Sequence, residues 1–470
     1  MVINSRSVGT MKKNSYERII FLIYIAGFLA MSITMALYQP HLDIKTGLLL
    51  SPPDEYNRML IPYFICKYGY LPTGLEEAVR IHGYGFSYGL YNTLPYIIQG
   101  YAMRFVSLFN SSDIAMLYTG RLVNVAFGTI MCIVVYLLSK RLFEDSCYRW
   151  LFCFGIMYLP QSLFLHTYIN TDSMCMLSTA MMLYGLVWGY QEGFQIKNSI
   201  WIALGISICS LSYYNAYGYI LACFLLFVIY YIHVEQKKWS FDLTAFRYGI
   251  FITVLVLICA GWWFVRAYFV LDGDILGFRM KQQLQDMYGF STFQATYQAR
   301  GVGILQMLVE NNFARSFISS FIAAYGGMSI TGNYWTYGSY GLLFLVGFLG
   351  VIKSVILEAG WSKMSVKERI FHLMMLFTIL CPFIILISFS YTMDYQHQGR
   401  YCMPSLVPLM YYTIFGLSSM LNGPKVKPSW RRVLIALAFF ITIGSAYYMV
   451  FIKALPVYKS FDIMLDVPWM

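Results

Sequence analysis

Long apolar runs alternate with short polar turns along almost the whole 470-residue chain. A helix needs about 20 mainly apolar residues to cross a bilayer, so the pattern predicts an all-α polytopic membrane protein with about 11 transmembrane helices, give or take two. The spans are expected near residues 19–38, 114–138, 149–167, 173–190, 199–213, 217–232, 248–270, 337–356, 370–390, 403–421 and 433–452. Only Tyr213–Tyr217 separates the fifth from the sixth, which are therefore also compatible with one broken helix.

Two segments between the runs, residues 39–113 and 271–336, are much longer than the other turns. Both contain amphipathic stretches, Tyr56–Tyr68 and Ile304–Tyr325, which we expect to lie along the membrane surface. We expect a single domain over residues 1–470, with the two long segments forming a cap on one face of the membrane.

Lysine and arginine residues gather in alternate short turns. Because such residues are retained on the cytoplasmic side, the pattern predicts a cytoplasmic N-terminus and places segments 39–113 and 271–336 outside. The turns assigned to the cytoplasm contain Lys140, Arg141, Arg149, Lys197, Lys237, Lys238, Arg247, Lys353, Lys363, Lys367, Arg369, Lys425, Lys427, Arg431 and Arg432.

The composition agrees with a membrane location, since 59% of the residues are hydrophobic, 19% aromatic and only 12% charged. The net charge of +11 is spread between apolar runs instead of forming the basic patch of a nucleic-acid-binding protein, so no nucleic-acid partner is expected. Lys12, Lys13 and Arg18 precede the run Ile19–Tyr38, which is too long for a cleaved signal peptide and predicts a membrane anchor. We therefore place the chain in the plasma membrane.

Cysteine and histidine patterns give no sign of a zinc or redox site. The ten cysteines form no C-x-x-C pair and lie mostly inside apolar runs, as buried thiols do. The six histidines form no H-x-x-H or H-E-x-x-H arrangement.

Two adjacent carboxylates, Asp54 and Glu55, follow two prolines in the first outer segment. On their own they fit an ordinary solvated turn. Other polar residues predicted at the same face change that assessment, because ionisable groups at the edge of a span are functional candidates. The polar residues in question are Arg121, Asn170, Asp172, Arg266, Asp272, Asp274, Asp394, His397 and Arg400. Individually, such arginines can reach lipid headgroups and such acids can cap helices. Together they suit a phosphate-bearing substrate, since arginine holds phosphate and a carboxylate accepts a proton from a nucleophile.

Three stretches give the chain a resemblance to a known family. They are P-D-E at 53–55 with the following YGYLPTG, then WWFVRAYFVLDGDILG, and finally QGRYCMPSLVP at 398–408. In this order and on one predicted face, they resemble the GT-C superfamily of polytopic glycosyltransferases, in a bacterial branch of uncharacterised membrane proteins. The chain departs from that branch at Arg58, where many members have histidine in a position expected to contact the acceptor.

The resemblance implies an inverting transfer of a sugar from a polyprenyl-phosphate donor to a cell-surface glycan or lipid acceptor. It implies Asp54 as general base with support from Glu55, and it leaves open a divalent cation, Mg²⁺ or Mn²⁺, with these two acids as ligands. Arg400 and Arg266 are expected to bind the donor phosphate. The supporting residues implied around them are Arg58, Asn170, Asp172, Asp274, His397 and Gln398.

Two other functions stay open at this point. A transporter or flippase of lipid-linked saccharides would also be polytopic, but such proteins often show internal repeats with polar residues at mid-span, and this chain shows no such repeat. A polysaccharide polymerase also has long outer loops with arginines, and the P-D-E pair is the feature that favours the transferase.

Overall fold

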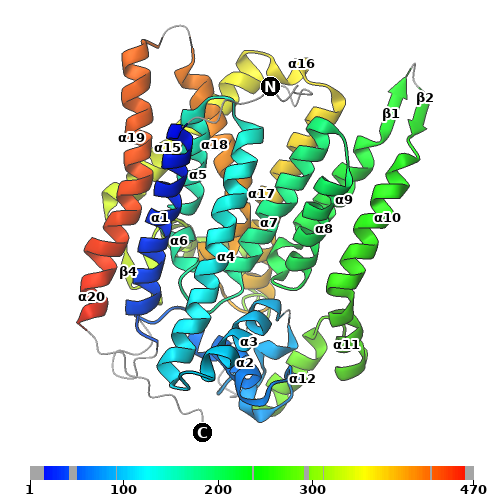
Figure 1. Ribbon diagram of the computed structural model, residues 1–470, viewed down its shortest axis with the longest axis vertical. Helices are drawn as coiled ribbons and strands as arrows, with labels where there is room; N and C mark the ends of the chain where they lie inside the picture. The colour runs from blue at the N-terminus through cyan, green and yellow to red at the C-terminus, as the bar shows by residue number, and fades with distance from the viewer. Residues whose placement is uncertain are drawn as a thin grey trace.

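A computed structural model describes residues 15–41, 50–91, 93–235, 238–289, 296–310, 312–423 and 426–460. The protein is 77% helical, as expected for an all-α membrane protein. Figure 1 shows the helices running roughly side by side along the long axis of the molecule.

The helices and strands have the following bounds. The α-helices are α1 (Ser15–Tyr38), α2 (Glu55–Tyr68), α3 (Leu94–Ser107), α4 (Asp113–Leu142), α5 (Ser146–Met157), α6 (Pro160–Leu165), α7 (Asp172–Glu192), α8 (Ile196–Ser210), α9 (Tyr217–Tyr230), α10 (Thr244–Val256), α11 (Trp262–Val270), α12 (Phe278–Tyr288), α13 (Ile304–Glu310), α14 (Phe313–Ile322), α15 (Tyr334–Ile352), α16 (Gly360–Lys363), α17 (Val366–Thr392), α18 (Leu406–Leu421), α19 (Pro428–Tyr447) and α20 (Leu455–Lys459). Short helical turns are η1 (Glu77–Val79), η2 (Tyr88–Leu90), η3 (Tyr214–Ala216), η4 (Leu257–Gly261), η5 (Lys353–Leu357), η6 (Gly399–Ser405) and η7 (Tyr448–Ala454). Two antiparallel hairpins pair β1 (Ile232–Glu235) with β2 (Lys238–Phe241) and β3 (Ala324–Tyr325) with β4 (Ile330–Thr331).

Six helices in the described residues are long and apolar enough to cross a membrane: Ser15–Tyr38, Asp113–Leu142, Thr244–Val270, Tyr334–Leu357, Val366–Thr392 and Pro428–Lys459. The other predicted spans also contain helix, but α5, α8, α9 and α18 are only 12 to 16 residues long. The expected count of about 11 transmembrane helices is therefore not confirmed, whereas the polytopic membrane character is.

The structure corrects one predicted span and settles whether two others are separate helices. The predicted span 149–167 is interrupted, because α5 ends at Met157 and Pro160 begins the separate helix α6. Proline is well suited to a first helical turn, where its missing N–H costs nothing. The fifth and sixth predicted spans are two helices, α8 and α9, joined by η3.

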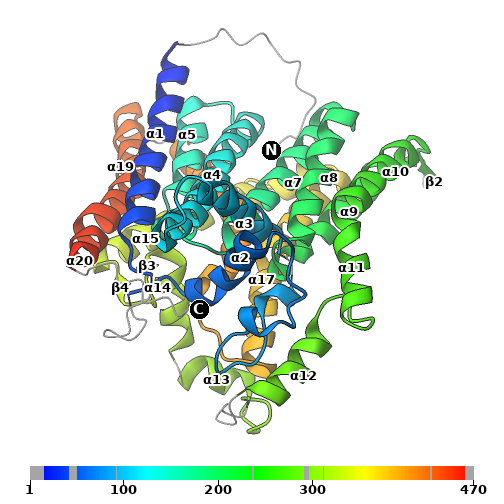
Figure 2. The ribbon, with the colours of Figure 1, turned by 60° about the horizontal axis from the view of Figure 1, so that its bottom comes forward.

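The turns between helices gather at two opposite ends of the molecule. In Figure 1 the upper end has the β1–β2 hairpin, α16 and the start of α19, and the lower end has α2, α3 and α12. The lower end thus contains helices of both long segments, and Figure 2 shows it turned toward the viewer. The predicted amphipathic stretches are indeed helical, as α2 and as α13 with α14.

The centre of the bundle is α7, which is buried along nearly its whole length and packs against α4 and α8. A helix that is apolar all round can be covered in this way. On the other side of the bundle α15 and α18 cross so closely that a Cβ atom added to Gly350 would lie 1.9 Å from the carbonyl oxygen of Gly416. Small residues allow such close approach between membrane helices, and this contact fixes α18 together with η6 directly before it.

Candidate active site

Asp54 stands directly before α2 in a left-handed backbone conformation, with φ of 61°. Aspartate is one of the few residues that adopts this conformation at low cost. Its side chain does not cap the helix and is 37% exposed. The carboxylate therefore makes no hydrogen bond to the backbone of the first turn of α2 and remains partly accessible.

Two guanidinium groups approach this carboxylate from different parts of the chain. Nη2 of Arg400, in η6, donates a hydrogen bond of 2.9 Å to Oδ2 of Asp54, and Nη2 of Arg58 lies 3.9 Å from the same oxygen. Burial acts to raise the pKa of Asp54, but the charges of Arg400 and Arg58 outweigh it and hold the pKa below its usual value. Asp54 is thus a carboxylate at neutral pH.

Hydroxyl groups hold both arginines in place. Arg400 donates to the hydroxyls of Tyr168 (3.2 Å) and Tyr401 (3.1 Å). Arg58 donates to the hydroxyls of Tyr96 (3.3 Å) and Thr171 (3.2 Å).

Each of these two guanidinium groups also retains an unused donor. Arg58 and Arg400 are buried, and within the described residues the Nε of each has no hydrogen-bond partner. Because a buried donor without a partner is costly, an anion that reached these two groups would relieve that cost.

Asp172 completes the cluster as the first residue of α7. It is buried, and its Oδ2 has no hydrogen-bond partner among the described residues. Its charge acts on both Arg58 and Arg400. The cluster thus unites two carboxylates and two guanidinium groups from three segments that are far apart in the sequence.

Glu55 points away from this cluster and is fully buried. Its Oε1 accepts hydrogen bonds from Nε of Arg121 and from the backbone N–H of Ile169, both at 2.9 Å. Its Oε2 accepts from Nη2 of Arg121 at 2.5 Å and lies 3.2 Å from Nδ1 of His41. Burial opposes ionisation, but Arg121 and His41 lower the pKa of Glu55 to about 2.

Arg121 extends this contact to the end of α1. It donates to the backbone carbonyls of Ala36, Gln39 and Pro40 at 3.0, 2.8 and 3.3 Å, which include acceptors that the last helical turn leaves unpaired. The Arg121–Glu55 pair therefore joins α1, α2 and α4 directly behind Asp54.

The acids that the resemblance suggested for a divalent cation do not fit one. Glu55 has both oxygens engaged by Arg121, His41 and Ile169, and Asp54 faces two positive groups. No group of three His, Cys, Asp or Glu side chains suited to a metal occurs in the described ranges. We therefore derive no step through a metal ion.

Asn170 and Asp274, two of the predicted supporting residues, shape turns. The side chain of Asn170 is buried and donates to the carbonyls of Leu165 and Tyr168, both at 2.8 Å. The carboxylate of Asp274 accepts from the backbone N–H groups of Gly277 (3.1 Å) and Met280 (2.8 Å) at the start of α12. Neither side chain makes a hydrogen bond to the arginines of the cluster in the part of the chain that is described.

Arg266 and His397 lie beside the cluster instead of in it. Nη2 of Arg266 donates to the carbonyl oxygens of Leu71 (3.3 Å) and Pro72 (2.8 Å), so it connects the turn after α2 to the middle of α11. His397 stacks on Tyr395 with 5.2 Å between ring centroids, and burial lowers the pKa of its imidazole. Gln398 precedes η6 and positions it through its backbone.

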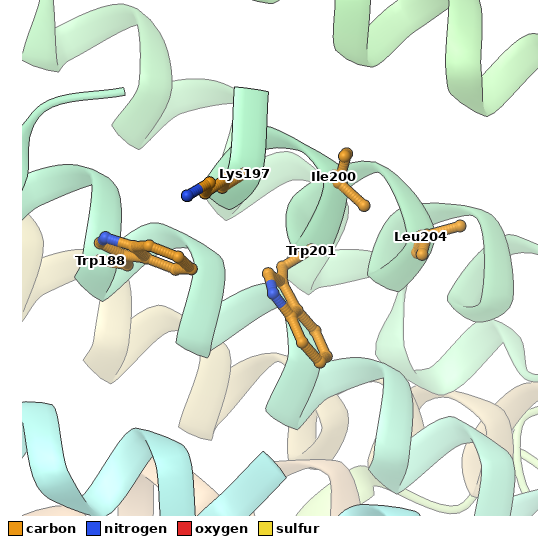
Figure 3. Close-up of a pocket in the computed structure, with 5 residues that line it drawn as sticks. All are labelled: Trp188, Lys197, Ile200, Trp201 and Leu204. Carbon is orange, nitrogen blue, oxygen red and sulfur yellow. The ribbon is translucent and has the colours of Figure 1, made fainter. Parts of the chain in front are cut away.

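A separate apolar pocket of about 340 Å³ is lined by Trp188, Lys197, Ile200, Trp201 and Leu204. Figure 3 shows the two indole rings and the lysine on the neighbouring helices α7 and α8. Trp188 is sixteen residues from Asp172 along α7, or about 24 Å at the helical rise. This pocket gathers no acidic groups and is not part of the cluster.

The sequence pattern missed several residues that the cluster uses. Tyr96, Tyr168 and Thr171 bind the guanidinium groups, and His41 contacts Glu55. Tyr168 and Thr171 flank Asn170 and Asp172 in the sequence, and this adjacency was the only available signal.

Comparison with known proteins decides the family. A family described as "Predicted membrane protein (DUF2142)" matches residues 76–410, well over half of the chain. The chain belongs to this DUF2142 family. Asp172 and Arg400 lie in the matched part of this DUF2142 protein, and Asp54 and Arg58 precede it. Among curated protein sequences, none matches.

Solved structures similar to this DUF2142 protein include the oligosaccharyltransferase AglB of Archaeoglobus fulgidus. The complex of AglB with an inhibitory peptide and a dolichol-phosphate matches with a TM-score of 0.52 and 13% identity, over 95% of this chain and 56% of AglB. The apo form matches with a TM-score of 0.54 and 14% identity, over 94% and 56%. This DUF2142 protein thus spans little more than half the length of AglB. It has the fold of the polytopic GT-C glycosyltransferases, which confirms the fold that the sequence resemblance implied.

Proposed function

We propose that this protein transfers a sugar from a polyprenyl-phosphate donor to a hydroxyl group of a glycan or lipid acceptor, in the manner of the GT-C glycosyltransferases. One observation carries the proposal: an accessible carboxylate, Asp54, lies against Arg400 and Arg58, two buried guanidinium groups with unused donors. Such groups match a phosphate, whose oxygens accept several charge-assisted hydrogen bonds. The similarity to AglB, which was solved with a dolichol-phosphate, supports this class of donor.

The proposed reaction is an inverting displacement in which Asp54 is the general base. The carboxylate of Asp54 takes the proton of the acceptor hydroxyl while the hydroxyl oxygen forms a bond to the anomeric carbon. The bond from that carbon to the phosphate oxygen breaks, and its electron pair leaves with the lipid phosphate. Arg400 and Arg58 meet the charge that develops there, a role in which preorganised donors are effective. Asp172 keeps these two side chains oriented.

The proposed setting is the plasma membrane, with a cytoplasmic N-terminus, about eleven helical passages and the cluster on the outer face. Segments 39–113 and 271–336 then cap the site, and membrane lipids, the lipid-linked donor and the acceptor are the partners. The charged cluster includes Asp54, directly before α2, and Asp172, at the start of α7, and Figure 1 shows α2 at the lower end of the bundle. A site at one end favours transfer at that face over passage through the membrane by a flippase.

Replacing Asp54 with asparagine tests the proposal. Asparagine keeps the size of the side chain but cannot accept the proton, so sugar transfer from labelled polyprenyl-phosphate sugars should fall by about 10²–10⁴, while binding of the donor persists. Asp272→Asn is the matched control, because its carboxylate is fully exposed in the other long segment. Transfer by Asp54→Asn at the rate of the parent would refute the assignment of the base, and transport without any glycosidic product would favour the flippase.

A further inference from the structure

A chain of hydrogen bonds leads from Asp54 toward the surface. The Nη2 of Arg400 that binds Asp54 also donates to the hydroxyl of Tyr401 (3.1 Å), and this hydroxyl donates to Oε1 of Gln396 (3.1 Å). Nε2 of Gln396 donates in turn to Oδ2 of Asp394 (2.7 Å). Arg400 is buried, Gln396 is half-buried and Asp394 is exposed, so the chain runs from the reacting carboxylate to the outside.

Two further segments, which pack against each other, bring Lys281 and Tyr84 within electrostatic range of Asp394. Gly85 contacts α12 so closely that an added Cβ atom would lie 2.6 Å from the backbone nitrogen of Gly289. Lys281 of α12 lies with its ammonium 4.8 Å from the centroid of the Phe86 ring, where its charge interacts with that of Asp394. Tyr84 is 47% exposed and lies within the electrostatic range of both Asp54 and Asp394.

These side chains combine the groups that a saccharide requires. A sugar hydroxyl both donates and accepts, so it is bound by a carboxylate and an amide together with an ammonium group. An exposed aromatic ring offers a flat apolar face with a polar tip. The negative charge of Asp394 disfavours a second phosphate at this place, because like charges repel at short range.

We propose that Asp394, Gln396, Lys281 and Tyr84 form an acceptor subsite that binds a saccharide. The inference rests on the proposed function and specifies its acceptor as a sugar, in contrast to the peptide in the AglB complex. A saccharide bound there is held next to Asp54, which takes the proton of its reacting hydroxyl. Arg400 binds the donor phosphate, and Asp394 lies three groups further along the hydrogen-bond chain, so donor and acceptor occupy different parts of it.

The test measures binding of the purified full-length protein to an immobilised panel of oligosaccharides and peptides. We expect Asp394→Ala and Lys281→Gln each to weaken saccharide binding about 10- to 100-fold, the usual effect of removing a charged hydrogen-bonding partner. Asp272→Asn, an exposed acid outside the subsite, should bind like the parent. Because Asp394 and Lys281 come from different segments, one local folding defect would not explain a loss of saccharide binding in both variants.

Three results would overturn the subsite: a parent that binds none of the saccharides, a parent that binds only peptides, or variants that bind saccharides as well as the parent. Binding of a labelled polyprenyl phosphate is measured on the same samples. Failure of the proposed function would show separately, as a parent that does not bind this lipid while its saccharide binding depends on Asp394.

Discussion

Replacing Glu55 with glutamine is expected to destabilise the protein, although Glu55 adjoins the proposed base. The substitution removes the negative charge that faces Arg121 and His41 in a fully buried position. It also places an amide group opposite two N–H donors of Arg121, where only an acceptor fits. The guanidinium group remains buried because it also holds the carbonyls at the end of α1.

The size of the effect follows from two independent arguments. Removing one partner of a buried ion pair costs roughly 3–5 kcal/mol. The pKa of Glu55 falls from its ordinary value of 4.5 to about 2, and a difference of this size corresponds to about 3 kcal/mol. The ratio of folded to unfolded protein should therefore drop by roughly two to four powers of ten.

The assay compares chemical unfolding of purified parent, Glu55→Gln and Asp54→Asn in the same detergent. Asp54 is 37% exposed, and solvent screens such a pair, so Asp54→Asn should cost no more than about 1 kcal/mol. The rate of sugar transfer per folded molecule should rank the two variants in the opposite order to their stability, because Asp54→Asn should be the slower enzyme. A Glu55→Gln protein as stable as the parent would refute the structural role of this pair.

The dependence on pH has a defined direction. Because the folded-state pKa of Glu55 lies below its unfolded value, its contribution to stability is complete above about pH 4.5 and is lost as the pH falls toward 2. Glutamine does not titrate. The difference in stability between the parent and Glu55→Gln should therefore narrow as the pH falls below 4.5, and a difference that is constant over this range would contradict the assigned cause.

Two further predictions concern the donor and the topology. Arg400→Ala should weaken binding of a labelled polyprenyl phosphate. Arg400→Lys should restore this binding only in part, because an ammonium group lacks the planar fork of guanidinium. Arg266→Ala should affect binding less, since Arg266 donates to two backbone carbonyls. For topology, a membrane-impermeant maleimide should label His82→Cys on intact cells but Lys427→Cys only after permeabilisation, and the reverse result would place Asp54 in the cytoplasm.

The sequence predicted where helices occur better than it predicted where each helix begins and ends. Every predicted span contains helix, because long apolar runs without polar interruption favour it. Hydropathy does not show where an apolar run departs from the α-helix, as it does between Met157 and Pro160 and in η6 before α18. Such turns depend on the neighbours that receive their backbone groups, for instance Ser320, whose hydroxyl accepts from the N–H of Gly399 at 2.7 Å.

Part of the charged cluster could be expected from residue type and predicted membrane side. Sequence reasoning placed Asp54, Asp172 and Arg400 on one face, and the fold brings them together. The residues alone could not separate Asp54 from Glu55, because adjacent acids look alike in a sequence although their side chains point to different partners; only the family resemblance assigned the base to Asp54. The left-handed backbone at Asp54 and the buried position of Arg121 produce that separation, and both arise only from tertiary packing.

The pairing of Asp54 with Arg400 also determines how the resting site responds to ions. The formal charges of Asp54, Asp172, Arg58 and Arg400 add to zero. The cluster without substrate is therefore electroneutral, and the free-energy cost of burying it away from water is lower. Small inorganic anions gain little from such a site, since each must first displace an internal counter-ion. The donor in the proposed reaction is a lipid phosphate, which its hydrocarbon tail concentrates at the membrane. Its exchange for the carboxylate on Arg400 would set Asp54 free when the donor binds.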